Sequence, residues 1–152
     1  MNKDIINKIK MDLDIYIKNN INKFYSKINF HNCLQLEIAD MSKKFELKSI
    51  TEYKIRYSSH SRRIDVVWIN FKKEIIFAIE IDSCLRIKSI EKLYHTEAEN
   101  KIWILYCNNF NKYKFNKLMS EYNKKNEINI IYFNLKKYQK NELNPNRYEQ
   151  PG

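Results

Sequence analysis

The segment from Glu74 to Asp82 constrains the fold more than any other part of the chain. Its side chains alternate in the period of two that a β-strand requires, and both faces are apolar until the acids Glu80 and Asp82 at its end. A strand that is apolar on both faces is typical of the centre of a sheet that other layers cover on both sides. The rest of the chain must therefore supply helices for two faces.

The other periodic segments predict the elements that could do this. Apolar residues at steps of three and four predict a long helix over 4–28, with a break near Asn19–Asn20 as the alternative, and a second helix over 34–45. In the second segment, the alternation of Leu34, Leu36 and Ile38 would also suit a strand. Strands are expected over 51–57, 63–69, 101–107 and 128–133, and helices over 86–99 and 112–125. We predict an α/β fold with a mixed central sheet flanked by helices.

The length of 152 residues is typical of one domain. We place this domain at 1–135, with 1–32 as an N-terminal helical extension. Residues 136–152 are polar and contain Pro145 and Pro151, which predicts a flexible tail.

The composition favours a polyanionic partner and excludes several classes of site. Lys and Arg exceed Asp and Glu by 28 to 18, which gives a formal charge of +10 and favours nucleic acid, although AT-rich codons also supply Lys together with Asn, Ile and Tyr. The only glycine is Gly152, so Gly-rich phosphate loops are excluded.

The cysteines and the apolar segments bear on the compartment. Three scattered cysteines form no Cys-x-x-Cys pair, so we expect neither disulfides nor a thiolate zinc site, and His31 with Cys33 is interpreted as incidental. No apolar stretch is long enough for a signal peptide or a membrane span. We expect a cytoplasmic, intracellular protein without a membrane partner.

Three acids are expected to meet at one end of the sheet. Glu80 and Asp82 leave the same face of their strand, and Asp65 interrupts the apolar run 64–69 on the neighbouring predicted strand. If these strands pair as a hairpin, the three carboxylates converge, and a hard cation, Mg²⁺ or Mn²⁺, would relieve their repulsion. The alternative is that Glu80 and Asp82 are solvated while Asp65 pairs with Arg62 or Arg63.

The sequence Arg-Ile-Asp-Val-Val-Trp, followed by a hairpin and then Ile-Glu-Ile-Asp, resembles the PD-(D/E)XK (restriction-endonuclease-like) nuclease superfamily over roughly residues 34–107. The resemblance implies an αβββαβ core, here with an extra long N-terminal helix. It also implies that Asp65 and Glu80 hold Mg²⁺, with the Ile81 carbonyl as a further ligand.

The chain departs from the family pattern at Asp82, where the family usually has lysine. Some members carry an acid there or move the basic residue elsewhere. Lys88 and Lys92, four apart on the next predicted helix, are candidates for the displaced charge, and we choose Lys92 as the catalytic residue. The family often adds one more carboxylate. We prefer Glu52 for this role, with Glu37 as the alternative.

The resemblance therefore implies a metal-dependent endonuclease that acts on DNA, with Asp65, Glu80, Asp82, Glu52 and Lys92 in its site. The cations expected to neutralise neighbouring phosphates are Arg56, Arg62, Arg63, Arg86 and Lys88. One alternative is a nuclease-like domain that has lost catalysis and binds nucleic acid or a protein. Another is an assembly protein that forms a homodimer through its N-terminal helix.

Overall fold

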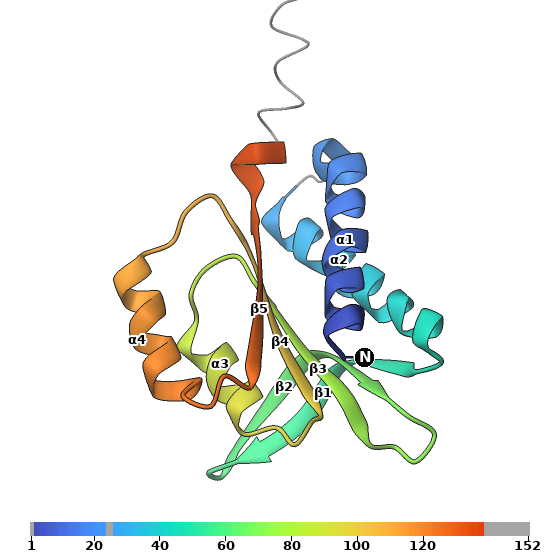
Figure 1. Cartoon of the computed structure of the whole chain (residues 1–152), viewed down its shortest axis with the longest axis vertical. Coiled ribbons are helices and arrows are strands. Elements are labelled where there is room, and N and C mark those ends of the chain that lie inside the picture. Colours follow the sequence, from blue (N-terminus) through green and yellow to red (C-terminus); the bar gives the residue numbers. More distant parts are fainter. Residues whose placement is uncertain (1, 24–25, 139–152) are drawn as a thin grey trace, which may run out of the picture.

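The computed structural model describes residues 2–23 and 26–138. It has helices on both faces of a five-stranded mixed sheet, as the sequence predicts (Figure 1). The order along the chain is α1(Asn2–Asn20), α2(Lys27–Met41), β1(Lys48–Tyr57), β2(His60–Ile69), β3(Ile75–Asp82), α3(Ile87–Tyr94), β4(Asn100–Cys107), α4(Lys112–Tyr122) and β5(Ile128–Asn134). Short 3₁₀ segments, η1(Ile21–Lys23) and η2(Ser42–Phe45), follow α1 and α2.

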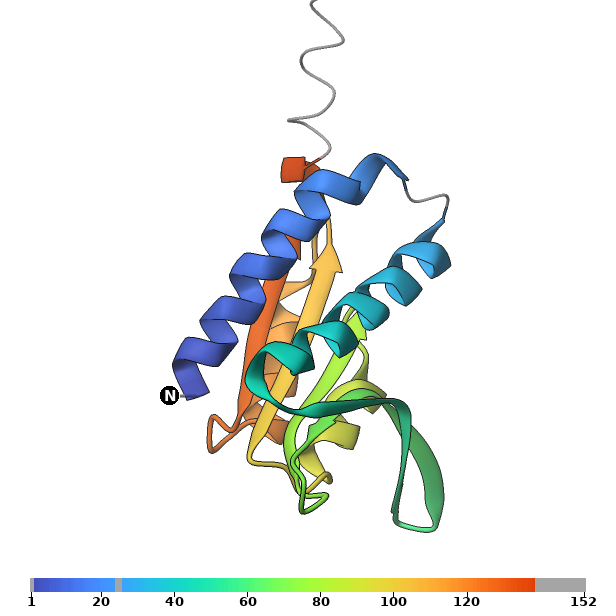
Figure 2. The ribbon, with the colours of Figure 1, turned by 90° about the vertical axis from the view of Figure 1, so that its right-hand side faces the viewer.

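The sheet has the spatial order β1-β2-β3-β4-β5. β1, β2 and β3 form an antiparallel meander, whereas β3, β4 and β5 run parallel, with α3 and α4 as the crossover helices. α1 and α2 cover one face, and α3 and α4 cover the other (Figures 1 and 2). β3 and β4 are paired on both sides, and every residue of β4 is buried, which explains their continuous apolar runs.

The apolar stripe of α1 packs on its own sheet. Ile9, Leu13 and Ile17 are fully buried in one cluster with Trp68 of β2 and Ile104 of β4. The inward side of α1 is therefore occupied within the chain.

The boundary between the first two helices differs from the prediction. The polar residues 29–32 were expected to separate two helices, but they belong to α2, and the chain instead breaks after Asn20, as the alternative predicted. Ser26 explains the start of α2, because its side chain accepts a hydrogen bond from the Asn29 amide and so caps the helix. A good N-cap outweighs the modest helix propensity of the asparagines that follow.

The other boundaries are close to those predicted. α3 is shorter than expected: it ends at Tyr94, and the Thr96 hydroxyl donates to the Lys92 carbonyl in its last turn. Of the predicted tail, residues 139–152 lie outside the described residues. Residues 135–138 form a helical turn, and Tyr138 is buried in the core beside α1.

The described residues contain no helix that is both long enough and apolar enough to cross a membrane.

Candidate functional site

The site lies where β2 and β3 separate, which we call the fork. The ladder between these strands runs from Ile69 to Val66, opposite Ile75 to Ile79. Beyond Val66 the two strands part, and Asp65 and Glu80 are the first residues after the separation. The fork exposes main-chain groups of both strands that no longer bond to each other.

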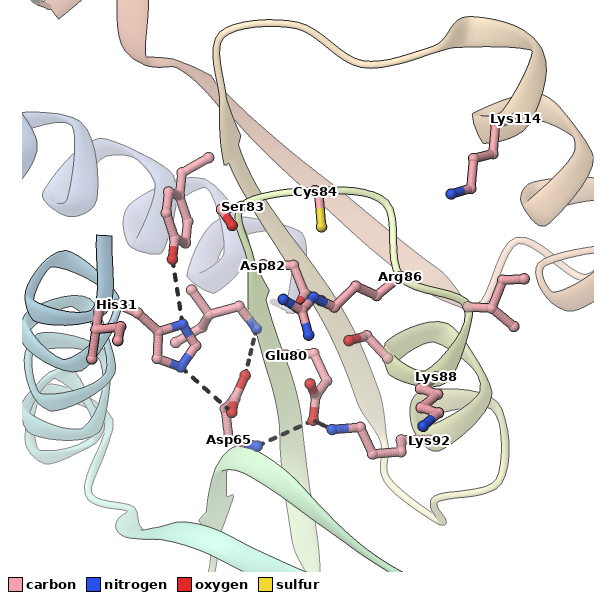
Figure 3. Close-up of a pocket in the computed structure, with 15 residues that line it drawn as sticks. His31, Asp65, Glu80, Asp82, Ser83, Cys84, Arg86, Lys88, Lys92 and Lys114 are labelled. Carbon is pink, nitrogen blue, oxygen red and sulfur yellow. Dashed lines mark hydrogen bonds and ion pairs between the residues drawn. The ribbon is translucent and has the colours of Figure 1, made fainter. Parts of the chain in front are cut away.

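The carboxylates of Asp65 and Glu80 bind these main-chain groups. The Asp65 amide donates to Glu80 Oε1 at 3.2 Å, and the Ile81 amide donates to Asp65 Oδ2 at 2.8 Å. Each acid therefore accepts an N–H from the opposite strand (Figure 3). Because N–H and C=O of one strand residue leave on the same side of the strand, the Ile81 carbonyl also faces the fork.

Glu80 is a buried carboxylate with one cationic partner among the described residues. Its side chain is 2% exposed, and Lys92 Nζ of α3 lies 3.0 Å from Oε1. Burial, and then the charge of Asp65, raise the pKa of Glu80 well above its usual range, while Lys92 opposes that shift. Lys92 Nζ also donates to the Arg63 carbonyl at 2.8 Å, which fixes the amine at the fork.

Asp82 has separate partners. Trp103 Nε1 donates to its Oδ2 at 2.7 Å, and Arg86 Nε lies 3.6 Å from its Oδ1. Burial raises the pKa of Asp82, whereas hydrogen bonds from Ser89 and Trp103 lower it. In the described parts of the chain, no three His, Cys, Asp or Glu side chains stand close enough together to hold a metal ion.

His31 of α2 was missed by the sequence interpretation. Its Nε2 lies 3.7 Å from Asp65 Oδ1, and its Nδ1 lies 3.4 Å from the Tyr106 hydroxyl. The neighbouring Asp65 carboxylate raises the pKa of His31, and burial opposes this effect. The signal that could have found it is the spacing of His31, Gln35 and Ile38, which places all three on the inward side of one helix.

Glu52 is linked to Asp65 through the side chain of Gln35. Gln35 Nε2 donates to Glu52 Oε1 at 3.3 Å and to the Asp65 carbonyl at 2.8 Å, so Gln35 connects the two. Glu52 has a positive φ of 53°, uncommon for a non-glycine residue within a strand. The charges that act on the rival Glu37 are those of Asp40, Lys44 and Asp12, none of which belongs to this arrangement.

The acids open into a cavity of about 930 Å³ between α2, α3 and α4. Its lining includes His31, Asp65, Glu80, Asp82 and Lys92, and at its edge the exposed cations Arg86, Lys88 and Lys114. Of the predicted phosphate-binding residues, Arg86 and Lys88 line this cavity, whereas Arg56, Arg62 and Arg63 lie on the β1–β2 hairpin. Lys114 of α4 was not predicted.

The donors at the fork suit a hard divalent cation. Mg²⁺ is usually held by one or two carboxylates and keeps several waters, so a complete protein cage is not required. Asp65, Glu80 and the Ile81 carbonyl offer oxygen ligands only, and the buried Glu80 carboxylate would gain from a nearby positive charge. The residues present therefore fit such an ion.

Comparison of the chain with known protein families, with curated proteins and with solved structures found no significant match.

Proposed function

We propose that the protein is a metal-dependent phosphodiesterase that cuts DNA at the fork. The observation that carries this proposal is the placement of Asp65 and Glu80: each carboxylate accepts a main-chain hydrogen bond from the opposite strand where the two strands separate, beside a lysine, in a cavity with a basic edge. The resemblance of this part of the sequence to PD-(D/E)XK nucleases supports the same reaction class.

Asp65 and Glu80 would hold Mg²⁺ or Mn²⁺ with the Ile81 carbonyl. The ion would neutralise charge on the scissile phosphate and lower the pKa of a bound water. Asp82 contributes differently in this proposal: through Trp103 and Arg86 it positions the end of β3 and the start of the α3 segment. This role explains why an acid can stand where the family usually has lysine.

Lys92 would supply the charge that Asp82 cannot. Its amine is 3.0 Å from Glu80 and its side chain is 16% exposed, so the ammonium is held within the cavity at the acids. A fixed cation there stabilises negative charge that develops on a phosphate oxygen. Arg86, Lys88 and Lys114 at the edge would neutralise the adjacent phosphates.

The test is a cleavage assay with supercoiled plasmid DNA. Wild-type protein should nick the plasmid with Mg²⁺ or Mn²⁺ and not with a chelator, and Asp65→Asn, Glu80→Gln and Lys92→Met should each lower the rate by about 10²-fold or more. Asp40→Asn is the matched control, because Asp40 is an exposed acid of α2 outside the cavity. Its rate should equal that of wild type.

A second candidate is a nuclease-like domain without catalysis that binds nucleic acid. It is favoured by the partners of Asp82, which leave two acids at the fork rather than three. Under this candidate the protein binds DNA but leaves the plasmid intact with either metal. A crystal soaked in Mn²⁺ separates the candidates independently of activity: the nuclease requires an anomalous peak between Asp65 and Glu80.

A further inference from the structure

The β1–β2 hairpin extends beyond the sheet as a two-stranded arm, which we define as residues 53–64. Its strands pair with each other from Tyr53–Ile64 to Tyr57–His60, whereas the β2–β3 ladder stops at Val66. The arm projects away from α1 and α2 (Figure 2). Ser58 and Ser59 close it with positive φ angles of 47° and 62°, the two-residue geometry that matches the twist of a β-ribbon.

One face of the arm packs on α3. Tyr53, Ile55 and Ile64 contact the core cluster beneath that helix, and the Tyr57 ring stacks on His95 with centroids 4.4 Å apart. Arg62 shares this face because it is paired with Ile55. The arm is therefore held against the body of the protein, which leaves its opposite face outward.

The outward face carries three cations. Lys54 and Arg63 are directly opposite each other in the ladder, and Arg56 lies opposite Ser61 on the same face. All three are exposed, and none forms an ion pair with a described residue. Like charges directly opposite each other destabilise an antiparallel pair. A polyanion bound along this face would remove that cost.

The geometry points to the outward face of the arm as a binding surface for a nucleic-acid duplex, separate from the cavity and resting on the proposed nucleic-acid substrate. The major groove is about 12 Å wide and admits a two-stranded β-ribbon. Strand residues rise about 3.3 Å each, so Arg63 is about 7 Å and Arg56, level with Ser61, about 13 Å along the arm from Asp65. Along the duplex axis, 7 Å corresponds to about two nucleotides of one strand.

The three arginines of the hairpin therefore have different roles. Arg56 and Arg63 contact phosphate together with Lys54, which the sequence interpretation did not include. Arg62 faces α3 and does not. The cations of the arm thereby bind the duplex outside the cavity, and the acids at the base of the arm face the strand to be cut.

The test compares two variants that lose the same charge. The arm variant combines Lys54→Gln, Arg56→Gln and Arg63→Gln, and the control combines Lys3→Gln, Lys8→Gln and Lys125→Gln, three exposed lysines of α1 and of the segment after α4. Binding is measured by fluorescence anisotropy with a labelled DNA duplex of about two helical turns. A chelator is present, so cleavage does not enter the measurement.

The arm variant should bind the duplex at least about tenfold more weakly than the control variant. The logarithm of its association constant should also depend less steeply on the logarithm of the salt concentration, with a slope smaller in magnitude by about 3 than that of the wild type. Arg62→Gln alone should leave both quantities unchanged. Without DNA, the arm variant should melt at or above the wild-type temperature, because its like-charge pair is gone. Equal binding by the two triple variants would overturn the inference, as would a clear preference of the wild type for single strands.

The proposed binding surface and the proposed nuclease activity can be rejected independently of each other. If the arm variant loses binding and the wild type does not cut DNA, the binding surface on the arm is supported and the nuclease activity is rejected. Unchanged binding by the arm variant, with metal-dependent cutting lost in Asp65→Asn, would support the nuclease and reject the arm.

Discussion

At the scale of single residues, the electrostatics of the cavity depends on Lys92. Glu80 is buried, and without a neighbouring cation its charged form would be strongly disfavoured. Lys92 approaches from another element and is partly shielded from water, so the attraction between the two is stronger than at the surface. The same amine is anchored by the Arg63 carbonyl, which joins α3 to β2.

We therefore expect a favourable coupling between Glu80 and Lys92. A double-mutant cycle with Glu80→Gln and Lys92→Met, measured by urea unfolding, should give about 2 kcal/mol, since either single change leaves a shielded charge without its partner. The exposed Asp40–Lys43 pair, at 2.8 Å, is the matched control and should show no measurable coupling. Additive effects of the two cavity changes would contradict the arrangement at the fork.

The sequence indicated some of these residues and not others. Asp65, Glu80 and Lys92 could be proposed because each stands out locally: an acid within an apolar run, an acid at a strand end, and a lysine at helical spacing on the next element. His31 was set aside with Cys33, because nothing in its own segment reveals a contact with Asp65, which lies 34 positions later in the chain. The hydrogen bond of Asp82 to Trp103 likewise joins two different strands. Such contacts depend on how elements far apart in the chain pack together, which no local pattern of residues specifies.

At the scale of elements, α1 has two different sides. Leu13 is fully buried against the sheet, whereas Ile15, two residues later, is 56% exposed. The periodicity of three and four predicted the buried side correctly, because a helix that covers a sheet needs one apolar stripe. It offered the end of α1 at Asn20 only as an alternative and did not predict the start of α2, which depends on the Ser26 cap.

Substitutions on the two sides of α1 should differ in cost. Leu13→Ala should lower the free energy of unfolding by about 2–5 kcal/mol, because it leaves a cavity in the core. Ile15→Ala should change it by less than about 0.5–1 kcal/mol. Chemical denaturation measures both. A large cost at Ile15, with a fall in molecular mass in solution, would instead indicate that α1 forms a dimer interface.

The turn at 135–138 is tied to α1 by one hydrogen bond. The Tyr138 hydroxyl donates to Asp14 Oδ1 at 2.6 Å, and this bond lowers the pKa of Asp14 below its usual value of 3.8. Tyr138→Phe should cost about 1–2 kcal/mol at neutral pH. Because the pKa of Asp14 is lower in the folded state, the advantage of the wild type is full above pH 3.8 and shrinks as the pH falls through that lowered pKa.

Urea unfolding of both proteins at neutral pH and at about pH 3 checks this expectation. The difference between wild type and Tyr138→Phe should be smaller in acid. A difference that stayed constant would show that the bond does not depend on the Asp14 charge.

At the scale of the whole molecule, a bound ion should be visible as added stability. An ion that binds only the folded protein raises the free energy of unfolding by about 2.7 kcal/mol at a concentration one hundred times its dissociation constant. Mg²⁺ or Mn²⁺ should therefore raise the melting temperature of the wild type and not that of Asp65→Asn. An equal rise in both proteins would place the ion elsewhere.

The order of the strands in space is also their order along the chain. Each new strand can thus join the edge left by the one before it, through short turns for β2 and β3 and through the helical crossovers α3 and α4 for β4 and β5. α1 is the exception. It shares a core cluster with Ile131 of β5 and is bonded through Asp14 to Tyr138, a residue 124 positions later. During synthesis on the ribosome α1 is made before these partners, so it can complete its contacts only after Tyr138 has emerged.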